Sequence, residues 1–216
     1  MYKINTSRLS EKAYQIIKEK LLHYEKGKYL SARDLSNEIG MSYTPVREAF
    51  LRLHKEGFLK RVPNVGFFVV HLEIGDIIEI FQVRECLENF VFKATFDTIT
   101  NNEIMEMEKL IDIQKDSLQE GDIRQYVKAD EMFHFIFFKL YGNKHFISLI
   151  KNVHEQYLFC SNRIAKSGST EGINEHIKIL EQIKQKNKDK ATKLLAEHIT
   201  NAKHRVTEGF IGALDL

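Results

Sequence analysis

Apolar residues recur at helical spacing in three segments near the start of the chain, which cover residues 10–24, 31–40 and 42–57. Ser31 and Ser42 stand at the beginning of the second and third segments, where serine is a preferred helix N-cap. Glycine stands at the end of both segments, where a helix commonly closes with a left-handed residue. The pattern predicts three helices separated by tight turns.

Two β-rich runs follow the third helix, at residues 58–62 and 67–70, and a Pro-Asn-Val-Gly turn connects them. These runs predict an antiparallel hairpin. Helices in this order followed by a hairpin are typical of a winged helix-turn-helix, which places one helix in the major groove of DNA and the hairpin beside it. We therefore predict a DNA-binding domain over residues 1–70, followed by a short connector at residues 71–75.

From residue 76 to the end of the chain every periodic segment is helical, and no proline follows Pro63. Glycine and asparagine residues separate the segments. The pattern predicts a mainly α-helical protein whose C-terminal domain, residues 76–216, is an all-helical antiparallel bundle of about six helices. The predicted helices lie near residues 76–98, 101–120, 122–141, 143–166, 172–186 and 188–211.

The charge balance differs between the two predicted domains. Residues 1–75 hold 13 Lys+Arg against 8 Asp+Glu, whereas residues 76–216 hold 19 against 22. A basic first part favours nucleic-acid binding by that part alone. The two cysteines form no Cys-x-x-Cys motif, and the N-terminus lacks the apolar core of a signal peptide. We therefore expect a cytoplasmic protein with no membrane partner.

Several basic and polar residues stand where a winged helix-turn-helix meets DNA. Thr44 and Arg47 lie at the start of the third helix, and Arg47 has the planar donor group that contacts guanine in two places. Arg33 begins the preceding helix, and the hairpin offers Lys60 and Arg61 to phosphates. The alternatives are solvated surface charges and a winged helix that binds protein. The predicted DNA-contacting set is Arg33, Tyr43, Thr44, Arg47, Arg52, Lys60, Arg61 and Gly66.

The run Ser-Tyr-Thr-Pro-Val-Arg-Glu-Ala-Phe at residues 42–50, followed by Arg-Leu and Glu-Gly, resembles the signature of the GntR family of bacterial transcription regulators. The resemblance covers about residues 8–70. It implies DNA contacts at Arg33, Thr44, Arg47 and Gly66. The family usually has arginine where this chain has Tyr43, and tyrosine cannot make the paired contact to guanine. We therefore place this protein's own operator preference at Tyr43.

Three histidines and one aspartate fall on apolar helix faces in the predicted bundle. Asp130 and His134 lie one turn apart on one face, and His176 and His198 lie on apolar stripes of two further helices. Buried polar groups are costly unless they satisfy one another or share a metal. This donor set suits a divalent transition metal such as Zn²⁺ or Ni²⁺. The alternative for each histidine is a hydrogen-bonded structural role, which we assign to the other six, at the surface or in the core.

The C-terminal residues also resemble a known domain. The pattern Asp-x-x-x-His, Gly-Asn, Glu-His-x-x-Ile-Leu and a final histidine, over residues 76–212, is similar to the helical FCD ligand-binding domain of the FadR subfamily. The resemblance implies that Asp130, His134, His176 and His198 are metal ligands. It also implies that Arg84 faces the cavity and pairs with a carboxylate effector. The alternative for Arg84 is an ion pair with Glu88 within one helix.

Together these features predict a ligand-responsive transcription regulator that is not an enzyme, with a repressor role taken from family analogy. We expect a homodimer, formed by the C-terminal domain, on a pseudopalindromic operator in double-stranded DNA. A small carboxylate at the metal and Arg84 would be the effector. One alternative is a regulator for which the metal is itself the signal. Another is a metalloenzyme fused to a DNA-binding module, because such a site with an open position can activate water.

Overall fold

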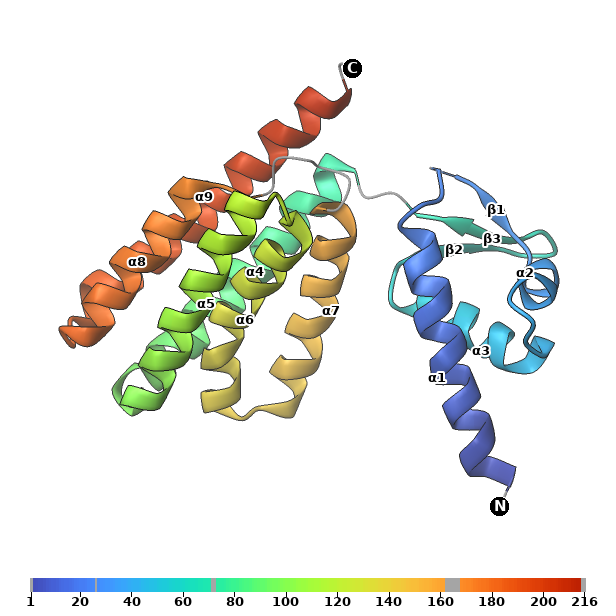
Figure 1. Ribbon diagram of the computed structural model, residues 1–216, viewed down its shortest axis with the longest axis horizontal. Helices are drawn as coiled ribbons and strands as arrows, with labels where there is room; N and C mark the ends of the chain where they lie inside the picture. Colours follow the sequence, from blue (N-terminus) through green and yellow to red (C-terminus); the bar gives the residue numbers. More distant parts are fainter. Residues whose placement is uncertain (1, 26, 71–72, 162–167, 215–216) are drawn as a thin grey trace. The chain divides into compact units, whose positions relative to one another are not determined.

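The structure is a computed structural model that divides into two compact units, Met1–His71 and Leu72–Leu216, which we call the N-terminal and C-terminal units (Figure 1). Each unit is described by itself below. The described residues are 2–25, 27–70, 73–161 and 168–214.

Three helices make up most of the N-terminal unit: α1 (Tyr2–Leu21), α2 (Ala32–Glu38) and α3 (Tyr43–Lys55). Apolar faces of α1 and α3 meet in a core that contains Ile17 and Phe50, both fully buried. The Ser31 side chain caps α2 by accepting from the amide of Asp34, as predicted, whereas Ser42 makes no such bond at α3. Helix α1 begins eight residues before the predicted start. The prediction missed these first turns because they carry no apolar stripe. The helix ends at Leu21.

A three-stranded antiparallel sheet completes this unit, in the order β1 (Tyr29–Leu30), β3 (Gly66–Val69), β2 (Leu59–Val62). The hairpin of β2 and β3 was predicted, but β1 was not, because two residues carry no periodic signal. The Tyr29 hydroxyl donates to the carbonyl of Val65 at 2.9 Å. Gly66 has φ of 149°, and a Cβ there would lie 2.5 Å from Cε2 of Tyr29. The hairpin tip therefore needs glycine at this position.

The described residues of the C-terminal unit form six α-helices, whose bounds lie within a few residues of the predicted ones. They are α4 (Ile74–Thr95), followed by the 3₁₀ turn η1 (Phe96–Thr98), α5 (Asn101–Glu120), α6 (Ile123–Tyr141), α7 (Lys144–Ser161), α8 (Thr170–Lys184) and α9 (Lys188–Leu214). The predicted continuation of α7 over 162–166 lies outside the described residues, as do positions 71 and 72 of the predicted connector. Gly121 and Gly142 end α5 and α6 with φ of 75° and 72°.

Helix α6 packs against α4, α5 and α7, while α9 packs against α4 and α8 (Figure 1). Phenylalanines fill the core, and the rings of Phe92 and Phe137 meet edge to face at 4.8 Å. Burying one such ring contributes about 1.5–3 kcal/mol to stability. This packing fixes α6 with one face toward α8 and α9, where the polar residues of the core gather. No helix in the described part of the chain has the length and apolar character to cross a membrane.

Candidate functional site

The predicted DNA-contacting residues at the start of α2 and α3 are exposed. Arg33 lies in the first turn of α2, and Tyr43, Thr44 and Arg47 lie in the first turns of α3. The Tyr43 side chain is 47% exposed, so its ring is available to a partner. Donors at the N-terminal end of a recognition helix are those that reach base edges.

Arg52 makes contacts within the chain that the sequence did not predict. Its guanidinium bonds Glu11 at 2.6 Å and Glu56 at 2.9 Å, and lies over the ring of Tyr14 at 3.8 Å. Glu11 and Tyr14 belong to α1, so Arg52 joins α1 to the end of α3. These contacts support a structural role for Arg52, and its predicted contact with DNA stays a prediction, since its side chain is 47% exposed.

The predicted DNA-contacting residues of the hairpin differ in their surroundings. Lys60 and Arg61 on β2 are exposed, as phosphate contacts require. At Gly66, the close approach seen in the structure is that of the Tyr29 ring. The glycine therefore has a structural reason besides the predicted approach to DNA.

The four predicted metal ligands come together from three helices. Asp130 and His134 extend from α6, His176 from α8 and His198 from α9, with one potential ligand atom from each within 4.8 Å of the others. The Nε2 atoms of the three histidines are 3.1–3.2 Å apart. Asp130 Oδ1 lies 3.6 Å from Nε2 of His176. The three imidazoles are at most 1% exposed, so water does not separate them.

The distances between the Nε2 atoms fit a shared metal ion. With metal–nitrogen bonds of about 2.1 Å, two ligand nitrogens lie about 3.0 Å apart at a right angle and about 3.4 Å apart at a tetrahedral angle. The observed 3.1–3.2 Å falls between these values. The donor set, three imidazole nitrogens and one carboxylate, also suits Zn²⁺ or Ni²⁺.

Each of the three histidines presents its other ring nitrogen to an acceptor on a different helix. His176 Nδ1 bonds Gln114 Oε1 of α5 at 3.0 Å, and His198 Nδ1 bonds a carboxylate of α8 at 2.8 Å. His134 Nδ1 lies 2.8 Å from Oε2 of Glu88 on α4, although not in the alignment of a good hydrogen bond. With the proton on Nδ1, each Nε2 offers a lone pair to the centre. Three converging lone pairs are poorly placed without a cation between them.

Burial favours the neutral form of two of these imidazoles, His176 and His198. It lowers the pKa of His176 well below the usual range, and the imidazoles of His198 and His134 lower it further. Burial also lowers the pKa of His198, against the raising effect of its bond to Glu175. Neutral imidazole is the form that binds a metal. The cluster is therefore prepared for a cation near neutral pH.

The carboxylate beside His198 is held in its ionised form. Glu175 accepts two bonds from Arg205, at 3.0 and 2.9 Å, and one from Asn201 at 2.8 Å. Burial alone would raise the pKa of Glu175, but the bonds from His198, Arg205 and Asn201 outweigh it and bring the pKa to about 2. An ionised acceptor strengthens the imidazole as a ligand.

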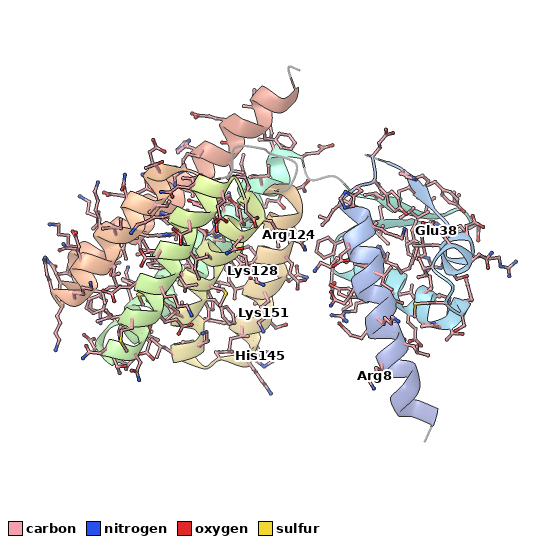
Figure 2. All side chains as sticks on the ribbon, in the orientation of Figure 1. Arg8, Glu38, Arg124, Lys128, His145 and Lys151 are labelled. Atoms are coloured by element: carbon pink, nitrogen blue, oxygen red, sulfur yellow. The ribbon has the colours of Figure 1, made fainter. Side chains whose placement is uncertain are left out.

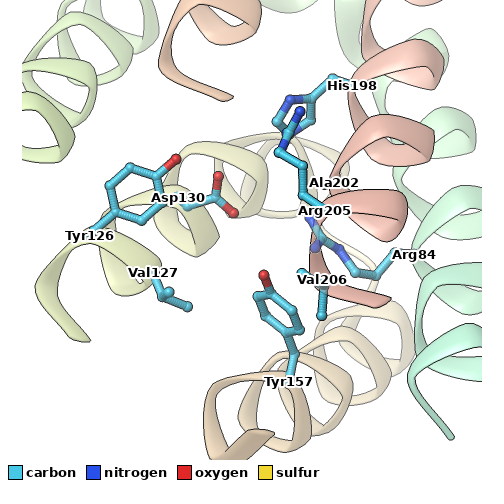
Figure 3. Close-up of a pocket in the computed structure, with 9 residues that line it drawn as sticks. All are labelled: Arg84, Tyr126, Val127, Asp130, Tyr157, His198, Ala202, Arg205 and Val206. Atoms are coloured by element: carbon cyan, nitrogen blue, oxygen red, sulfur yellow. The ribbon is translucent and has the colours of Figure 1, made fainter. Parts of the chain in front are cut away.

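A cavity of about 20 Å³ lies beside the cluster, which is room for about one water molecule. Figure 3 shows the hydroxyls of Tyr126 and Tyr157, the carboxylate of Asp130 and the guanidinium of Arg84 directed toward the same space. A ligand larger than a single water molecule therefore requires side chains to move. The lining residues are Arg84, Tyr126, Val127, Asp130, Tyr157, His198, Ala202, Arg205 and Val206.

Arg84 makes the ion pair with Glu88 that was one alternative for it, and it also lines the cavity, as the other alternative requires. It is 1% exposed, its Nε bonds Glu88 Oε1 at 2.7 Å, and it also lines the cavity. Its Nη2 atom is buried and has no hydrogen-bond partner among the described residues. Burial alone would raise the pKa of Glu88, but the charge of Arg84 and the contact with His134 hold it well below its usual range. The guanidinium is thus bonded to Glu88 through Nε, while Nη2 has no described partner.

His154 is buried, unlike the exposed His23, His54, His145 and His204. It lies between Glu88 Oε1 at 3.6 Å and Glu131 Oε1 at 3.5 Å. It extends the polar network toward α7. By contrast, Figure 2 shows His145 at the surface together with Arg124, Lys128 and Lys151, and all four are exposed.

Sequence reasoning missed most of the residues around the ligands. Gln114, Tyr126, Tyr157 and Arg205 carry no motif, and their helices bring them to the site only when packed. Glu175 was visible as the neighbour of His176 in the Glu-His pattern, but nothing in the sequence assigned it to His198.

Two family models match the chain. One, for bacterial regulatory proteins of the gntR family, matches residues 9–69, and the other, for the FCD domain, matches residues 79–201. The second alone covers more than half of the chain.

Named relatives align over most of their length. The chain is 26% identical over 193 residues to the HTH-type transcriptional regulator YdhC of Bacillus subtilis, covering 86% of each chain. It is 25% identical to the Nta operon transcriptional regulator of Aminobacter aminovorans, covering 89% of this chain and 90% of that one. It is also 25% identical to the gluconate operon transcriptional repressor of Bacillus licheniformis, covering 85% and 78%.

Solved structures show the same fold. Escherichia coli McbR/YncC superposes with a TM-score of 0.77 at 21% identity, over 94% of this chain and 98% of that one. The metal-free FCD domain of TM0439 superposes with a TM-score of 0.57 at 23% identity, over 66% of this chain and 99% of that domain. The chain therefore belongs to the GntR family of bacterial transcription regulators and carries an FCD domain behind its winged helix-turn-helix.

Proposed function

We propose that this regulator, a member of the FadR subfamily, binds its operator under the control of a small carboxylate held at a metal ion in the C-terminal unit. The observation that carries the proposal is the meeting of two features at one place. Three Nε2 lone pairs converge within 3.2 Å of one another, and the buried Nη2 of Arg84 has no described partner in the adjoining cavity.

Asp130, His134, His176 and His198 would hold the metal, with Zn²⁺ or Ni²⁺ favoured by the donor set. The ion would supply a Lewis-acidic position for an anionic oxygen. Four protein donors leave such a position open if the ion takes five or six ligands. The residues that support the histidines, Glu88, Gln114 and Glu175, would keep each Nε2 directed inward.

A carboxylate suits the cavity for reasons of charge and hydrogen bonding. Arg84 offers a free Nη2, and the hydroxyls of Tyr126 and Tyr157 line the same space. A guanidinium beside a metal position recognises the two oxygens of a carboxylate. The Bacillus licheniformis relative is named for the gluconate operon, and gluconate is itself a carboxylate. The same relative is named a repressor, which supports a repressor role for this protein.

DNA binding would use Arg33, Tyr43, Thr44 and Arg47, with Lys60 and Arg61 of the hairpin on phosphates. A homodimer would match a two-fold operator. Exposed apolar side chains on the C-terminal unit are consistent with a partner chain: Val83 and Phe90 on α4 are 39% and 51% exposed, and Leu149 on α7 is 54% exposed. A coupling free energy of only about 1–3 kcal/mol between effector binding and operator binding is enough for regulation.

One experiment tests the proposal as a whole. The purified full chain is analysed for bound metal and for co-purified organic acids, and operator binding is measured before and after dialysis against a chelator. We expect one metal site per chain and a release of DNA by a carboxylate only when the metal is bound. A protein that binds no transition metal, or that responds to no organic acid, would contradict it.

A regulator that senses the metal itself is the second candidate, and the small volume of the cavity favours it. In that case chelation would abolish DNA binding while organic acids have no effect. The relatives named above are all regulators, so the metalloenzyme alternative receives no support from them.

A further inference from the structure

Glu88 lies between Arg84 and His134, and its two carboxylate oxygens serve different partners. Oε1 accepts from Arg84 Nε at 2.7 Å, and Oε2 lies 2.8 Å from His134 Nδ1. All three side chains are at most 1% exposed. One buried carboxylate therefore contacts both the proposed metal ligand and the proposed anion-binding arginine.

The charged residues that line the cavity are Arg84, Arg205 and Asp130. Arg84 is paired with Glu88, and Arg205 with Glu175, at distances of 2.7 and 2.9 Å. Asp130 has no lysine or arginine within ion-pair distance in the described part of the chain, and its contact is the imidazole of His176. The carboxylate of Asp130, which has no described cationic partner, disfavours a second anion in this buried place.

A divalent cation at the four ligands outweighs the single charge of Asp130, and a monoanion would cancel the remaining positive charge. Glu88 affects the binding of both the cation and the anion. Its charge attracts the cation and supports His134, and the same charge occupies the Arg84 guanidinium that an anion needs. Neutralising Glu88 alone should therefore weaken the site for a cation and strengthen it for an anion.

We propose that Glu88 couples the two ligands, so that anion binding at Arg84 depends on the metal at His134. This inference rests on the proposed function, because it needs both a metal and an anion at this site. Glu88 is a positioning residue here: it touches His134 and Arg84 but is not itself a ligand of either the metal or the anion.

The test uses the full chain and the isosteric variant Glu88→Gln. Zn²⁺ affinity is measured by competition with a chromophoric chelator, and acetate binding by calorimetry on metal-stripped and Zn²⁺-loaded protein. In the wild type we expect Zn²⁺ to raise acetate affinity by roughly 5- to 150-fold. In Glu88→Gln we expect Zn²⁺ affinity to fall roughly 10- to 100-fold, acetate affinity of the stripped protein to rise, and the coupling factor to fall below that of the wild type.

Opposite signs for the two ligands separate this role from a purely structural one, because damage to the fold weakens both. Arg84→Gln provides the reciprocal change: acetate binding should be lost while Zn²⁺ affinity is kept or raised. Glu108→Gln removes an exposed carboxylate paired with Lys184 at 2.6 Å and should leave both affinities at wild-type values. If Glu88→Gln does not fold, Arg84→Gln decides alone, and a Zn²⁺ affinity below wild type would overturn the proposal.

The outcomes also distinguish a failure of this inference from a failure of the proposed function. Zn²⁺-loaded wild type that binds no acetate would remove the carboxylate site, and the coupling with it. Wild type that couples Zn²⁺ and acetate, with Glu88→Gln retaining the same coupling factor, would overturn the role of Glu88 and leave the proposed function standing.

Discussion

Glu175 on α8 accepts a 2.8 Å hydrogen bond from Nδ1 of His198 on α9, and so fixes which nitrogen of that imidazole faces the cluster. Replacing the carboxylate by an amide in Glu175→Gln should lower Zn²⁺ affinity roughly 10- to 100-fold, as removal of a supporting acceptor does at other metal sites. Chelator competition measures the change. Asn201→Ala, which removes only the amide that bonds the other Glu175 oxygen, is the matched control and should have a smaller effect. Equal affinities for Glu175→Gln and wild type would contradict this role.

His134→Ala should lower the metal content of the purified protein and the response of operator binding to ligand, while DNA binding itself remains. The reason is that His134 lies in the core of the C-terminal unit, whereas the residues proposed to contact DNA belong to the N-terminal unit. Elemental analysis and gel-shift titration measure the two effects. His145→Ala, an exposed histidine of α7, is the control. Full metal occupancy in His134→Ala would refute the ligand assignment.

Arg47→Ala should weaken operator binding by about 1–3 kcal/mol if the guanidinium contacts a base. Binding is measured at fixed salt, with a scrambled duplex for comparison. Arg52→Met gives a contrast within the same helix: loss of the contacts to Glu11 and Tyr14 should lower the melting temperature without changing base preference. Unchanged operator affinity in Arg47→Ala would remove Arg47 from the base-contacting set.

Tyr43→Arg should change the operator sequence that the protein selects, because arginine makes the paired guanine contact that tyrosine cannot make. The side chain is exposed at the first position of α3, so the substitution needs no repacking. Selection from a random duplex library, carried out in parallel for both proteins, gives the comparison. Identical selected sites would show that this position does not read the operator.

Gly66→Ala should destabilise the N-terminal unit by about 1–3 kcal/mol, since its φ of 149° suits glycine and the added Cβ would meet the Tyr29 ring. In a Tyr29→Ala background the same substitution should cost less, because the ring is gone and only the backbone strain remains. Thermal unfolding of the four proteins in this cycle measures the difference. Equal costs in both backgrounds would show that the ring contact does not matter.

The helices could be predicted from the sequence because helical periodicity is a local property. An apolar stripe, a polar residue before the first turn and a glycine after the last are all local signals, and this is why α2, α3 and α5 begin and end close to the predicted positions. Where the local signal was missing, prediction failed: β1 has two residues, and the first turns of α1 have no apolar face. The gathering of the four metal-ligand candidates was also accessible, because each lies on an inward stripe of its own helix.

Only the tertiary structure decided which partners those side chains meet, because these contacts join residues far apart in the chain. Gln114 reaches His176 across 62 positions, and Arg52 reaches Glu11 across 41. Arg84 illustrates the limit best. The sequence left an intrahelical pair with Glu88 and a cavity-facing role as alternatives. Packing of α4 against α6 and α9 allows both, because the guanidinium has one edge for Glu88 and another for the cavity.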